Sequence, residues 1–473
     1  MHIFDTLSGR AESVSKAKRI KMFVCGPTVY DEAHIGHART YVFFDAAIRY
    51  LRSRGWKLFY LQNITDIDDK IIKRAAELGI APKSLAGKFA KSYLADMKAL
   101  GVTSVDKYAY ATKFIPQIVC QVKALAARGY AYRASDGYYF DIAKFKDYGK
   151  LSRRSAEQAE SSVSRIDEGI DKKNKGDFCL WKLRQTRTSA DLDADQRGKA
   201  EEPFWRTELG TGRPGWHIED TAITEKFFGP QYDIHGGGVD LKFPHHEAEI
   251  AQQEAASGKE PFVKIWMHTG LLFVDGQKMS KSLNNFTTIK DFLAEHDARV
   301  FRMMVLLHHY RSNMNYTDAL LEQSFASLQG IEEFVDKMDF VARKSVRTAG
   351  SEGVGKLPQE TEEKFNAALE KDFNTPEALA AIFHAVSLGN NVAWQMTPGD
   401  AKRLGNMAKK LLNALGLEVR STRLPFSVRR MIIAKDRFRI DKQFIQSDAL
   451  RKKLESLGYK VEDTPLGSFV RKK

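Results

Sequence analysis

The string His-Ile-Gly-His at residues 34–37 could bind a triphosphate. It follows a short apolar run and a Gly-Pro turn, so we expect it to open a helix with His34 and His37 on one face. Gly36 leaves room for a flat ring to approach the backbone. A helix N-terminus attracts phosphate, and two imidazoles there can donate hydrogen bonds to a triphosphate in its transition state. Taken alone the string is weak evidence, because two ordinary surface histidines share the same pattern.

The loop sequence Lys-Met-Ser-Lys-Ser at residues 278–282 is a second candidate for phosphate binding. Lys278 and Lys281 lie near small hydroxyl side chains and follow Gly276. A lysine is a mobile point charge, so two of them can fold over a phosphate chain. Considered alone, a solvated basic loop is the simpler interpretation.

Three further residues have the types and placement of metal ligands. His245 and Glu249 are four residues apart, so a helix presents both on one face. Cys25 ends the first apolar run, at the place where the active site of an open α/β sheet lies. Taken by themselves, His245 and Glu249 are better interpreted as a polar pair on a helix surface.

The elements that must position these side chains alternate between strands and helices. A strand, a turn, a helix from about 33 to 52 and a second strand open the chain, which is typical of a βαβ unit. Strands are expected at residues 21–25, 57–61, 232–235 and 265–268. This pattern predicts an α/β fold with a Rossmann-type parallel sheet covered by helices.

Residues from about 115 to 204 interrupt this pattern and split the sheet-forming sequence. Within them, a helix is expected at 115–128 and a strand at 138–142. From about residue 292 the pattern is helical, and a break at 416–425 separates it from a basic tail. The predicted architecture is therefore a split parallel sheet with a connective insertion, followed by an α-helical bundle and a small basic C-terminal domain.

Composition narrows the class of protein. The 473 residues are 43% apolar and 28% charged, which is ordinary globular composition and argues against a fibrous or disordered chain. No apolar stretch approaches the roughly 20 residues of a membrane span, and the first residues do not resemble a secretory signal. Three widely spaced cysteines make a poor disulfide framework, so we expect a cytoplasmic protein with no membrane partner.

The excess of basic residues is concentrated at one end of the chain. The formal net charge is +14, and residues 420–473 hold 15 basic and 6 acidic side chains. A basic tail suggests a polyanion partner, either nucleic acid or an acidic membrane face. A charged end that only improves solubility explains the same composition.

The two signature strings, in this order and separated by an interrupted α/β pattern, resemble those of the class I aminoacyl-tRNA synthetases. Within that class the chain resembles the cysteinyl-tRNA synthetases over nearly its whole length. The strings that carry this resemblance are FVCGPTVYD at 23–31, NITDIDDK at 63–70, GRPGWHIE at 212–219, DIHGGG at 233–238, FPHHE at 243–247 and SDALR at 447–451.

This resemblance implies an enzyme that activates L-cysteine with ATP and transfers it to the 3′ end of a cysteine tRNA. Magnesium is expected with ATP, and the expected oligomeric state is a monomer. The resemblance assigns His34, His37, Lys278 and Lys281 to catalysis, Gly36, Gly238, Asp240 and Lys281 to ATP binding, and Cys25 and Trp216 to substrate binding.

The resemblance also implies a catalytic zinc ion, which the family holds with two cysteines, a histidine and a glutamate. Cys25, His245 and Glu249 fill three of these positions, and Asp220 stands where the family pattern has cysteine. A carboxylate is an accepted zinc ligand, so we expect Asp220 to bind zinc, although more weakly than a thiolate would. Two alternatives stay open: a site of three residues completed by water, and a chain that binds no metal tightly. The ion would separate cysteine from serine by binding the substrate sulfur as a thiolate.

The family pattern divides the chain into six expected segments. They are two halves of the Rossmann-type catalytic domain at 1–114 and 209–270, a connective insertion at 115–208, a stem-contact region with the lysine loop at 271–320, a tRNA-binding helical bundle at 321–416 and a basic anticodon-binding domain at 417–473.

Two other functions stay open at this point. A shorter relative joins cysteine to an amino sugar through the same adenylate chemistry, but a sugar acceptor does not require the basic C-terminal region. A non-catalytic RNA-binding paralogue is favoured only by Asp220, because pure binding would not require His34, His37 and the two loop lysines.

Overall fold

The computed structural model describes residues 1–472 except 17–18, 155–170, 185–201, 280–284 and 349–353. It contains two compact units. The first comprises Met1–Ala298 and Tyr310–Tyr316, and the second comprises Arg299–His309 and Thr317–Lys473. Within the described ranges, no helix combines the length and the apolar character that crossing a bilayer requires.

The centre of the first unit is a five-stranded parallel sheet. Its strands, in spatial order, are β12 (Val263–Thr269), β11 (Tyr232–Gly238), β3 (Ile20–Val24), β4 (Leu58–Ile64) and β5 (Lys107–Tyr110). The order of the strands reverses between β3 and β11, so their carboxyl ends flank the crevice in which open α/β sheets bind ligands. The sheet confirms the predicted fold class, and it contains all four expected strands.

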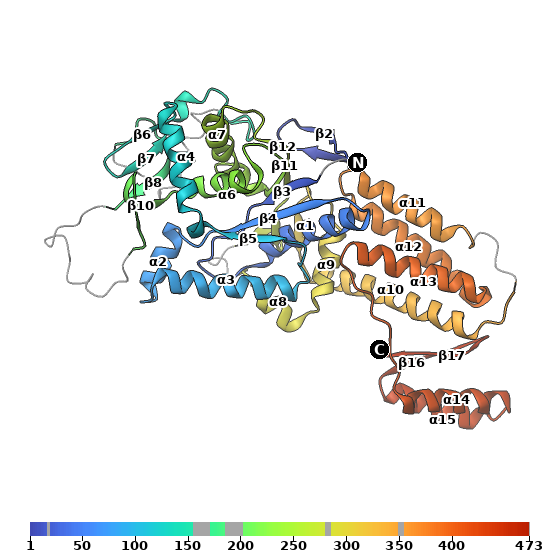
Figure 1. The fold of residues 1–473 in the computed structure, drawn as a ribbon. Coiled ribbons are helices and arrows are strands. Elements are labelled where there is room, and N and C mark those ends of the chain that lie inside the picture. The colour runs from blue at the N-terminus through green and yellow to red at the C-terminus, as the bar shows by residue number, and fades with distance from the viewer. Residues whose placement is uncertain (17–18, 155–170, 185–201, 280–284, 349–353, 473) are drawn as a thin grey trace. The chain divides into compact units, whose positions relative to one another are not determined.

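Helices cover both faces of this sheet (Figure 1). On one face lie α1 (Ile35–Ser53), α3 (Pro82–Ala99) and α8 (Ile289–Glu295), and α2 (Asp69–Glu77) packs against α3. On the other face lie α4 (Ile115–Ala127), α6 (Ile218–Phe228) and α7 (His245–Ser257). The helix expected at 115–128 is α4, and the helix expected at 33–52 is α1.

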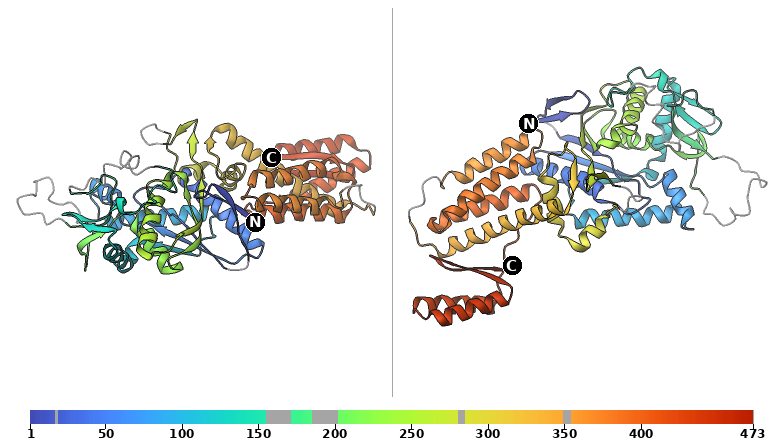
Figure 2. Two further views of the ribbon diagram at one scale, coloured as in Figure 1. Left: turned by 90° about the horizontal axis from the view of Figure 1, so that it is seen from above. Right: turned by 180° about the vertical axis from the view of Figure 1, so that it is seen from behind.

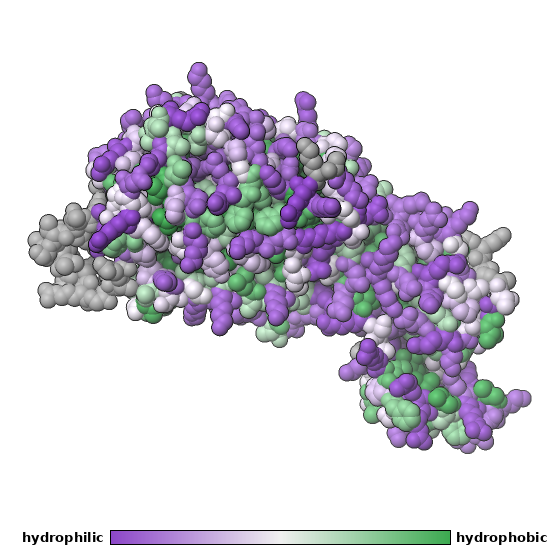
Figure 3. Space-filling model, in the orientation of Figure 1, coloured by the Kyte–Doolittle hydropathy of each residue, from purple (hydrophilic) through white to green (hydrophobic). Residues whose placement is uncertain are grey.

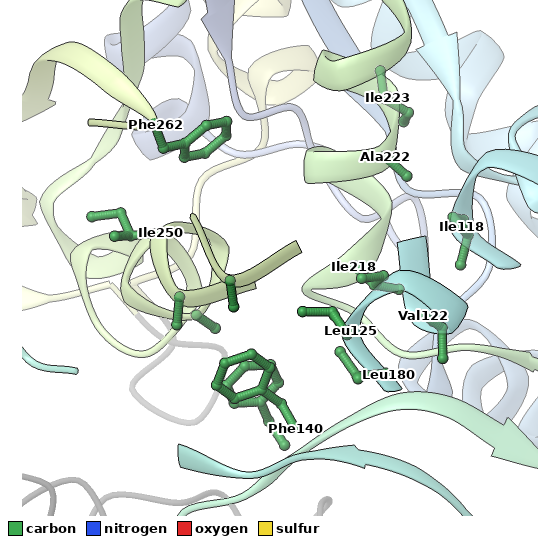
Figure 4. Packing of buried hydrophobic residues seen from close by; sticks show 14 of the residues in the cluster. Ile118, Val122, Leu125, Phe140, Leu180, Ile218, Ala222, Ile223, Ile250 and Phe262 are labelled. Atoms are coloured by element: carbon green, nitrogen blue, oxygen red, sulfur yellow. The ribbon is translucent and has the colours of Figure 1, made fainter. Parts of the chain in front are cut away.

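An apolar core joins α4, α6 and α7 to the sheet (Figure 4). Ile118, Val122 and Leu125 recur at intervals of three and four residues, so α4 presents them on one face. Each such buried side chain stabilises the fold by roughly 1.5–3 kcal/mol. The core continues through Phe140 and Leu180 into a second sheet.

This second sheet is five-stranded and antiparallel throughout. Its order is β6 (Ala131–Arg133), β7 (Gly137–Phe140), β8 (Phe178–Leu183), β10 (Gly210–Pro214) and β9 (Trp205–Thr207). The strand expected at 138–142 is β7. Strand β10 leads directly into α6, so this sheet is continuous in sequence with one of the helices that cover the main sheet.

Smaller elements complete the first unit. The hairpin β1 (His2–Asp5) and β2 (Arg10–Ser13) is antiparallel, and β14 (Gln277–Lys278), β13 (Leu272–Val274) and β15 (Met314–Tyr316) form a three-stranded sheet. The short 3₁₀ helices are η1 (Ala111–Lys113), η2 (Ile142–Lys144) and η6 (Val239–Lys242).

Arg39 of α1 anchors the three-stranded sheet. Its buried guanidinium donates a hydrogen bond to the carbonyl of Leu271, immediately before β13. It also donates to the carbonyls of Tyr310 and Ser312, in the segment that leads to β15. The strand that ends at Lys278 is therefore attached to α1 through its neighbour β13.

The second unit is mainly helical. Four helices run side by side in a bundle, as Figures 1 and 2 show from three directions. They are α10 (Asp318–Lys344), α11 (Leu357–Glu370), α12 (Thr375–Asn391) and α13 (Pro398–Ala414), and the unit also contains most of α9 (Ala298–Leu306) and the short helix η8 (Ala393–Gln395).

The C-terminal part of this unit is a small α/β module. Helices α14 (Phe426–Ile440) and α15 (Phe444–Ser456) pack on a hairpin of β16 (Tyr459–Thr464) and β17 (Gly467–Lys472). Its core consists of Val428, Leu454, Val461 and Val470. The sequence analysis did not predict this hairpin, because each strand contributes few apolar residues and the charged residues around them obscure the alternation.

Candidate active site

Cys25 lies at the point where the order of the strands reverses. It directly follows β3, and its backbone N–H donates to the carbonyl of Gly236 in β11 over 3.0 Å. The hydroxyl of Tyr41 on α1 donates to the carbonyl of Cys25 over 3.1 Å. Strand pairing and the helix thus hold the thiol at the crevice between the two halves of the sheet.

A pocket of about 350 Å³ opens above this crevice. Ten of the sequence-predicted site residues line it: Cys25, His34, Gly36, His37, Trp216, Asp220, Gly238, Asp240, His245 and Lys278. Glu249 lies buried behind this wall, in contact with Cys25. Lys281 lies outside the residues that the structure describes.

His34 and His37 cap the first turn of α1 reciprocally. Nδ1 of His34 accepts the backbone N–H of Gly36 over 3.1 Å, and Nδ1 of His37 accepts the backbone N–H of His34 over 3.4 Å. The two rings are stacked, with centroids 3.8 Å apart. Since each Nδ1 is an acceptor, the proton of each neutral ring is on Nε2, which makes that atom a donor.

Burial lowers the pKa of His37 to about 4. The ring is therefore a neutral hydrogen-bond donor throughout the physiological range. Such a donor stabilises charge that develops on a phosphate without itself exchanging a proton with solvent.

Lys278 reaches the same pocket from the last position of β14, whose partner strand is β13. The neighbouring Met279 side chain touches the start of α1: a Cβ atom placed on Gly36 would lie 3.4 Å from Met279 Cε. The base of the lysine loop and the two histidines therefore meet at one wall of the pocket.

The glycine run at the end of β11 allows α7 to approach closely. A Cβ atom on Gly237 would lie 2.8 Å from Cε1 of His246, which is closer than packed atoms tolerate. Beyond the run, Gly238 and Asp240 line the pocket. The glycines thus bring the end of the strand against α7, where the expected metal ligands His245 and Glu249 lie.

The four expected metal ligands converge on one another. Asp220 Oδ2 lies 3.3 Å from Cys25 Sγ and 3.0 Å from His245 Nε2. Glu249 Oε1 lies 3.2 Å from His245 Nε2 and 3.8 Å from Cys25 Sγ. These are spacings that four ligands of one ion adopt, and all four residues are buried.

Two histidines that the sequence analysis did not consider as ligands also point at the thiol. His246 Nε2 lies 3.2 Å and His235 Nε2 lies 3.4 Å from Cys25 Sγ. With Glu249 they complete a second group of four candidate ligands around Cys25. The sequence did contain a signal for His246. On a helix, residues three and four positions apart share a face, so His246 lies on the same face as Glu249, just as His245 does.

A bound cation explains the polar atoms around Cys25 better than hydrogen bonds among those atoms do. A thiol has one proton, yet four oxygen and nitrogen acceptors lie within 3.8 Å of this sulfur. Among the described residues, Oδ1 of Asp220 and Oε2 of Glu249 are buried without a hydrogen-bond partner. Buried polar atoms are rarely left unpaired, so the set fits a bound metal ion.

The imidazoles are oriented by partners on their far sides. His235 Nδ1 lies 2.6 Å from the hydroxyl of Tyr232, and His246 Nδ1 lies 2.8 Å from Nε2 of His268. His245 Nδ1 lies 2.8 Å from Nδ1 of His217. Metal-binding histidines characteristically use their second nitrogen in this way.

Burial sets the protonation of the cluster. It raises the pKa of the Cys25 thiol, and the nearby Asp220 and Glu249 raise it further. It raises the pKa of Glu249 and lowers the pKa of His235 and His246. A divalent cation favours the thiolate and carboxylates, because its charge offsets their burial, and neutral imidazole is the form that binds metal.

Trp216 forms another wall of the pocket. Its ring is stacked on His245, and the ammonium of Lys70 lies 5.7 Å from the centre of the indole. The same ammonium lies 5.8 Å from the ring of Tyr30. The sequence analysis did not single out Lys70 or Tyr30, although both belong to the strings that carried the family resemblance.

Comparison with known proteins identifies the class. The model of the class I (C) tRNA synthetase catalytic domain matches residues 11–326, and the model of the DALR domain matches residues 364–420. Together with the parallel sheet and the two signature motifs, this match defines a class I aminoacyl-tRNA synthetase. The sequence of this chain is 40% identical to the cysteine–tRNA ligase of Thermococcus kodakarensis over 497 residues, which cover 99% of this chain and 98% of that protein. The chain belongs to the cysteine–tRNA ligase family.

Other relatives agree with this assignment. The cysteine–tRNA ligase of Thermoplasma acidophilum is 40% identical over 467 residues, 98% of either chain. Among solved structures, a leucyl synthetase complex of Agrobacterium radiobacter K84, with tRNA and LeuAMS, has a TM-score of 0.62 at 12% identity over 86% of this chain and 84% of that chain. A methionyl-tRNA synthetase of Mycobacterium tuberculosis has a TM-score of 0.59 at 15% identity, over 85% of this chain and 90% of that chain. These two structures share the fold.

Proposed function

We propose that the protein ligates L-cysteine to a cysteine tRNA at the expense of ATP. The observation that carries this proposal is one pocket in which the stacked histidines, Lys278 and the cluster around Cys25 meet. The first two groups suit the phosphates, and the third suits the thiol of the amino acid. The family assignment makes the tRNA the acceptor.

The reaction has two steps. The cysteine carboxylate attacks the α-phosphate of ATP, which forms cysteinyl-adenylate and releases pyrophosphate. A hydroxyl of the 3′-terminal adenosine then attacks the carbonyl carbon, and AMP leaves. His34 and His37 would donate from Nε2 to phosphate oxygens, and Lys278 would neutralise their charge.

ATP binding is assigned to the same pocket. The adenine ring would lie beside Gly36, and Asp240 beyond Gly238 would accept hydrogen bonds from the ribose hydroxyls. Magnesium would accompany the phosphates. Lys281, outside the described residues, remains assigned to the phosphates with Lys278.

A zinc ion would be held by Cys25, Asp220, His245 and Glu249. When bound, zinc supplies a soft Lewis acid that stabilises a thiolate far better than an alkoxide. Trp216, stacked on His245, would limit the space beside the bound amino acid. Cysteine would then be selected over serine by its sulfur.

The second unit is assigned to tRNA. The bundle at 321–416 and the basic module at 417–473 would bind it, and salt would weaken the complex because phosphate contacts depend on ionic strength. Helices α14 and α15 expose the apolar side chains of Phe426, Ile433, Ile440 and Phe444 among basic residues (Figure 3). Bases of an unpaired loop stack on aromatic rings such as those of Phe426 and Phe444.

The remaining assignments concern the state of the protein. We propose a cytoplasmic monomer, and the three free cysteines Cys25, Cys120 and Cys179 are consistent with a reducing compartment. The six segments expected from the sequence remain our proposed division of the chain.

The decisive experiment is ATP–pyrophosphate exchange followed by acceptor analysis. Metal-replete protein is expected to catalyse exchange that depends on cysteine, and then to charge a cysteine tRNA. Exchange without tRNA charging, but with transfer to an amino sugar, would favour the sugar ligase. Absence of exchange would favour a non-catalytic RNA-binding protein.

The role of Asp220 has its own test. Asp220→Ala is expected to lower the zinc content at equal metal supply, whereas Asp220→Cys, which introduces the family cysteine, is expected to raise the affinity. Unchanged zinc content in Asp220→Ala would remove Asp220 from the ligand set.

A further inference from the structure

Glu219 is a buried acidic residue close to the pocket, and no basic side chain in the described ranges forms an ion pair with it. It is 1% exposed and occupies the second position of α6. Within the described part of the chain its side chain has one hydrogen-bond partner: Oε1 accepts a hydrogen bond from the hydroxyl of Thr65. A buried charge without a counter-charge is costly, so a carboxylate in this position calls for a cation.

The charged side chains around Glu219 do not supply that cation. Those that act on it most strongly are Asp220, Asp68 and Asp66, and all three are acidic. Asp66 accepts hydrogen bonds from Thr112, and Asp68 caps the start of α2. Asp220 belongs to the expected metal ligands, whereas neither candidate group of ligands among the described residues includes Glu219. A cation for Glu219 must therefore come from a bound molecule.

Thr65 connects Glu219 to the pocket. It directly follows β4, and it is one of the residues that line the pocket. Its hydroxyl donates its single proton to Glu219 and accepts a hydrogen bond from Nδ2 of Asn63 over 3.3 Å. Because a hydroxyl oxygen can accept two hydrogen bonds, one lone pair of Thr65 stays available for a donor in the pocket.

The ends of two neighbouring strands hold Thr65 in place. Its backbone N–H donates to the carbonyl of Pro27, and its carbonyl accepts the N–H of Val29, each over 3.1 Å. Asn63, two residues earlier on the same face of the sheet, accepts the N–H of Gly26 at Oδ1 over 2.5 Å. The hydroxyl is therefore fixed relative to the segment that follows β3 and Cys25.

The pocket presents few acidic groups to a cationic ligand. Among its described lining residues only Asp220 and Asp240 are acidic, and these are assigned to the metal ion and to the ribose. An amino acid carries a positive charge on its α-ammonium group, which has three N–H donors and no acceptor. The free lone pair of Thr65, with the charge of Glu219 behind it, matches such a donor.

We infer that Glu219 positions the α-ammonium group of the bound amino acid. Thr65 accepts a hydrogen bond from the ammonium group, while Glu219 orients the Thr65 hydroxyl and supplies the negative charge. Glu219 is a positioning residue, because it acts through Thr65 and does not itself line the pocket. The inference deepens the proposed function and rests on it, since it requires that the pocket bind cysteine.

Binding of three related thiols tests this inference on the full-length, zinc-loaded protein. Cysteine and cysteamine both have an ammonium group, whereas 3-mercaptopropionate has the thiol and carboxylate of cysteine but no amino group. Calorimetric titration measures the Kd of each. Glu219→Gln keeps the shape of the side chain and removes its charge, so it is expected to weaken cysteine and cysteamine by about tenfold, because the Coulomb attraction is lost. The Kd of 3-mercaptopropionate is expected to stay within about threefold. Equal weakening of all three thiols would show a purely structural role and overturn the inference.

Substitutions of Thr65 provide a second test, which stays decisive if Glu219→Gln does not fold. Thr65→Val removes the hydroxyl and is expected to reproduce the selective loss of cysteine and cysteamine, whereas Thr65→Ser retains the hydroxyl and should restore binding. The double variant with Glu219→Gln is expected to lose at most about twofold more than the weaker-binding single variant, because both residues act through one hydrogen bond. Additive losses would contradict action through Thr65.

Glu225→Gln is the matched control on the same helix. The Glu225 carboxylate also accepts a hydrogen bond from a neutral side chain, Nε2 of Gln121, over 3.0 Å, but Glu225 is not among the lining residues of the pocket. Its removal is expected to change the Kd of each thiol by less than about twofold. A selective loss as large as that of Glu219→Gln would show that any charge on α6 suffices, which would overturn the inference.

The exchange assay separates this inference from the proposed function. Cysteine-dependent exchange by the unsubstituted protein, together with equal losses for the three thiols in Glu219→Gln, would leave the proposed function standing and refute the role of Glu219. If the unsubstituted protein bound neither cysteine nor cysteamine, the inference would be refuted as well. Exchange measured on the same preparation would then decide the proposed function independently.

Discussion

Trp216 lies face to face with His245, with ring centroids 4.4 Å apart and an angle of 19° between the planes. Nδ1 of His245 contacts His217, whose ring centroid lies 5.0 Å from those of both Trp216 and His245. The imidazole is therefore packed against an indole on its face and a second histidine at its edge, while its Nε2 points at Asp220 and Glu249. This arrangement connects the shape of the amino-acid pocket to the orientation of a proposed metal ligand.

Trp216→Ala is expected to raise the KM for cysteine about two- to twelvefold, because an aromatic contact of this kind contributes about 0.5–1.5 kcal/mol. Cysteine-dependent exchange kinetics measure the effect. Trp216→Phe retains a flat ring and is the control, with an expected change of less than about threefold. Equal effects of both substitutions would contradict a stacking role.

His37→Ala is expected to lower kcat for exchange by about 10²-fold, because one donor to the transition state is lost. The KM for cysteine should change little, since His37 belongs to the proposed phosphate wall. Because burial lowers the pKa of His37 to about 4, the residue stays neutral between pH 6 and 8. The variant and the unsubstituted protein should therefore have parallel pH profiles in that range. A pH-dependent difference would show that the imidazole titrates there.

Arg39→Met is expected to lower the free energy of unfolding by about 3 kcal/mol, because it leaves buried carbonyls at the base of β13 and β15 without their donor. Denaturant unfolding measures this. Arg52→Met on the same helix is the matched control: its ion pair with Asp106 is about one-third exposed, so less than about 1 kcal/mol is expected. Similar losses in both variants would contradict the anchoring role.

Asp96→Asn is expected to stabilise the protein at pH 7 by about 1–2 kcal/mol. The carboxyl on α3 is 4% exposed, and burial raises its pKa to about 6. Between about pH 4 and 6 the folded chain thus binds a proton that the unfolded chain releases, so the free energy of unfolding falls as the pH rises. The asparagine variant lacks this loss, and the two proteins should converge below pH 4. Urea unfolding of both proteins at pH 7 and below pH 4 measures these differences. Equal stability of the two proteins at pH 7 would contradict the prediction.

Local spacing in the sequence predicted a large part of the site. The helix start at His34 and the shared face of His245 and Glu249 depend only on neighbouring residues, and the structure contains both. Four of the five strands of the main sheet were predicted, because buried parallel strands are apolar runs, whereas the short edge strand β5 was not. Convergence of Cys25 and Asp220 was expected only through the family resemblance.

His235 and His246 show which contacts cannot be predicted from local sequence patterns. His235 faces Cys25 because β11 pairs with β3 in one particular register, and two hundred residues separate them in the sequence. His246 is next to an expected ligand, but its direction depends on how α7 packs against Gly237. Long-range register and helix packing decide such contacts, and a single sequence does not specify either.

The pairing of β13 with β15 has a consequence for synthesis on the ribosome. Cys25 and the start of α1 emerge early, but the base of the lysine loop acquires its parallel partner only when Met314–Tyr316 has been made. A nascent chain that stops at residue 300 already contains every residue we place in the pocket, yet it lacks the strand that braces Lys278 through β13. The segment between α9 and α10 must therefore be translated before β15 can pair with β13 and complete the sheet that supports Lys278.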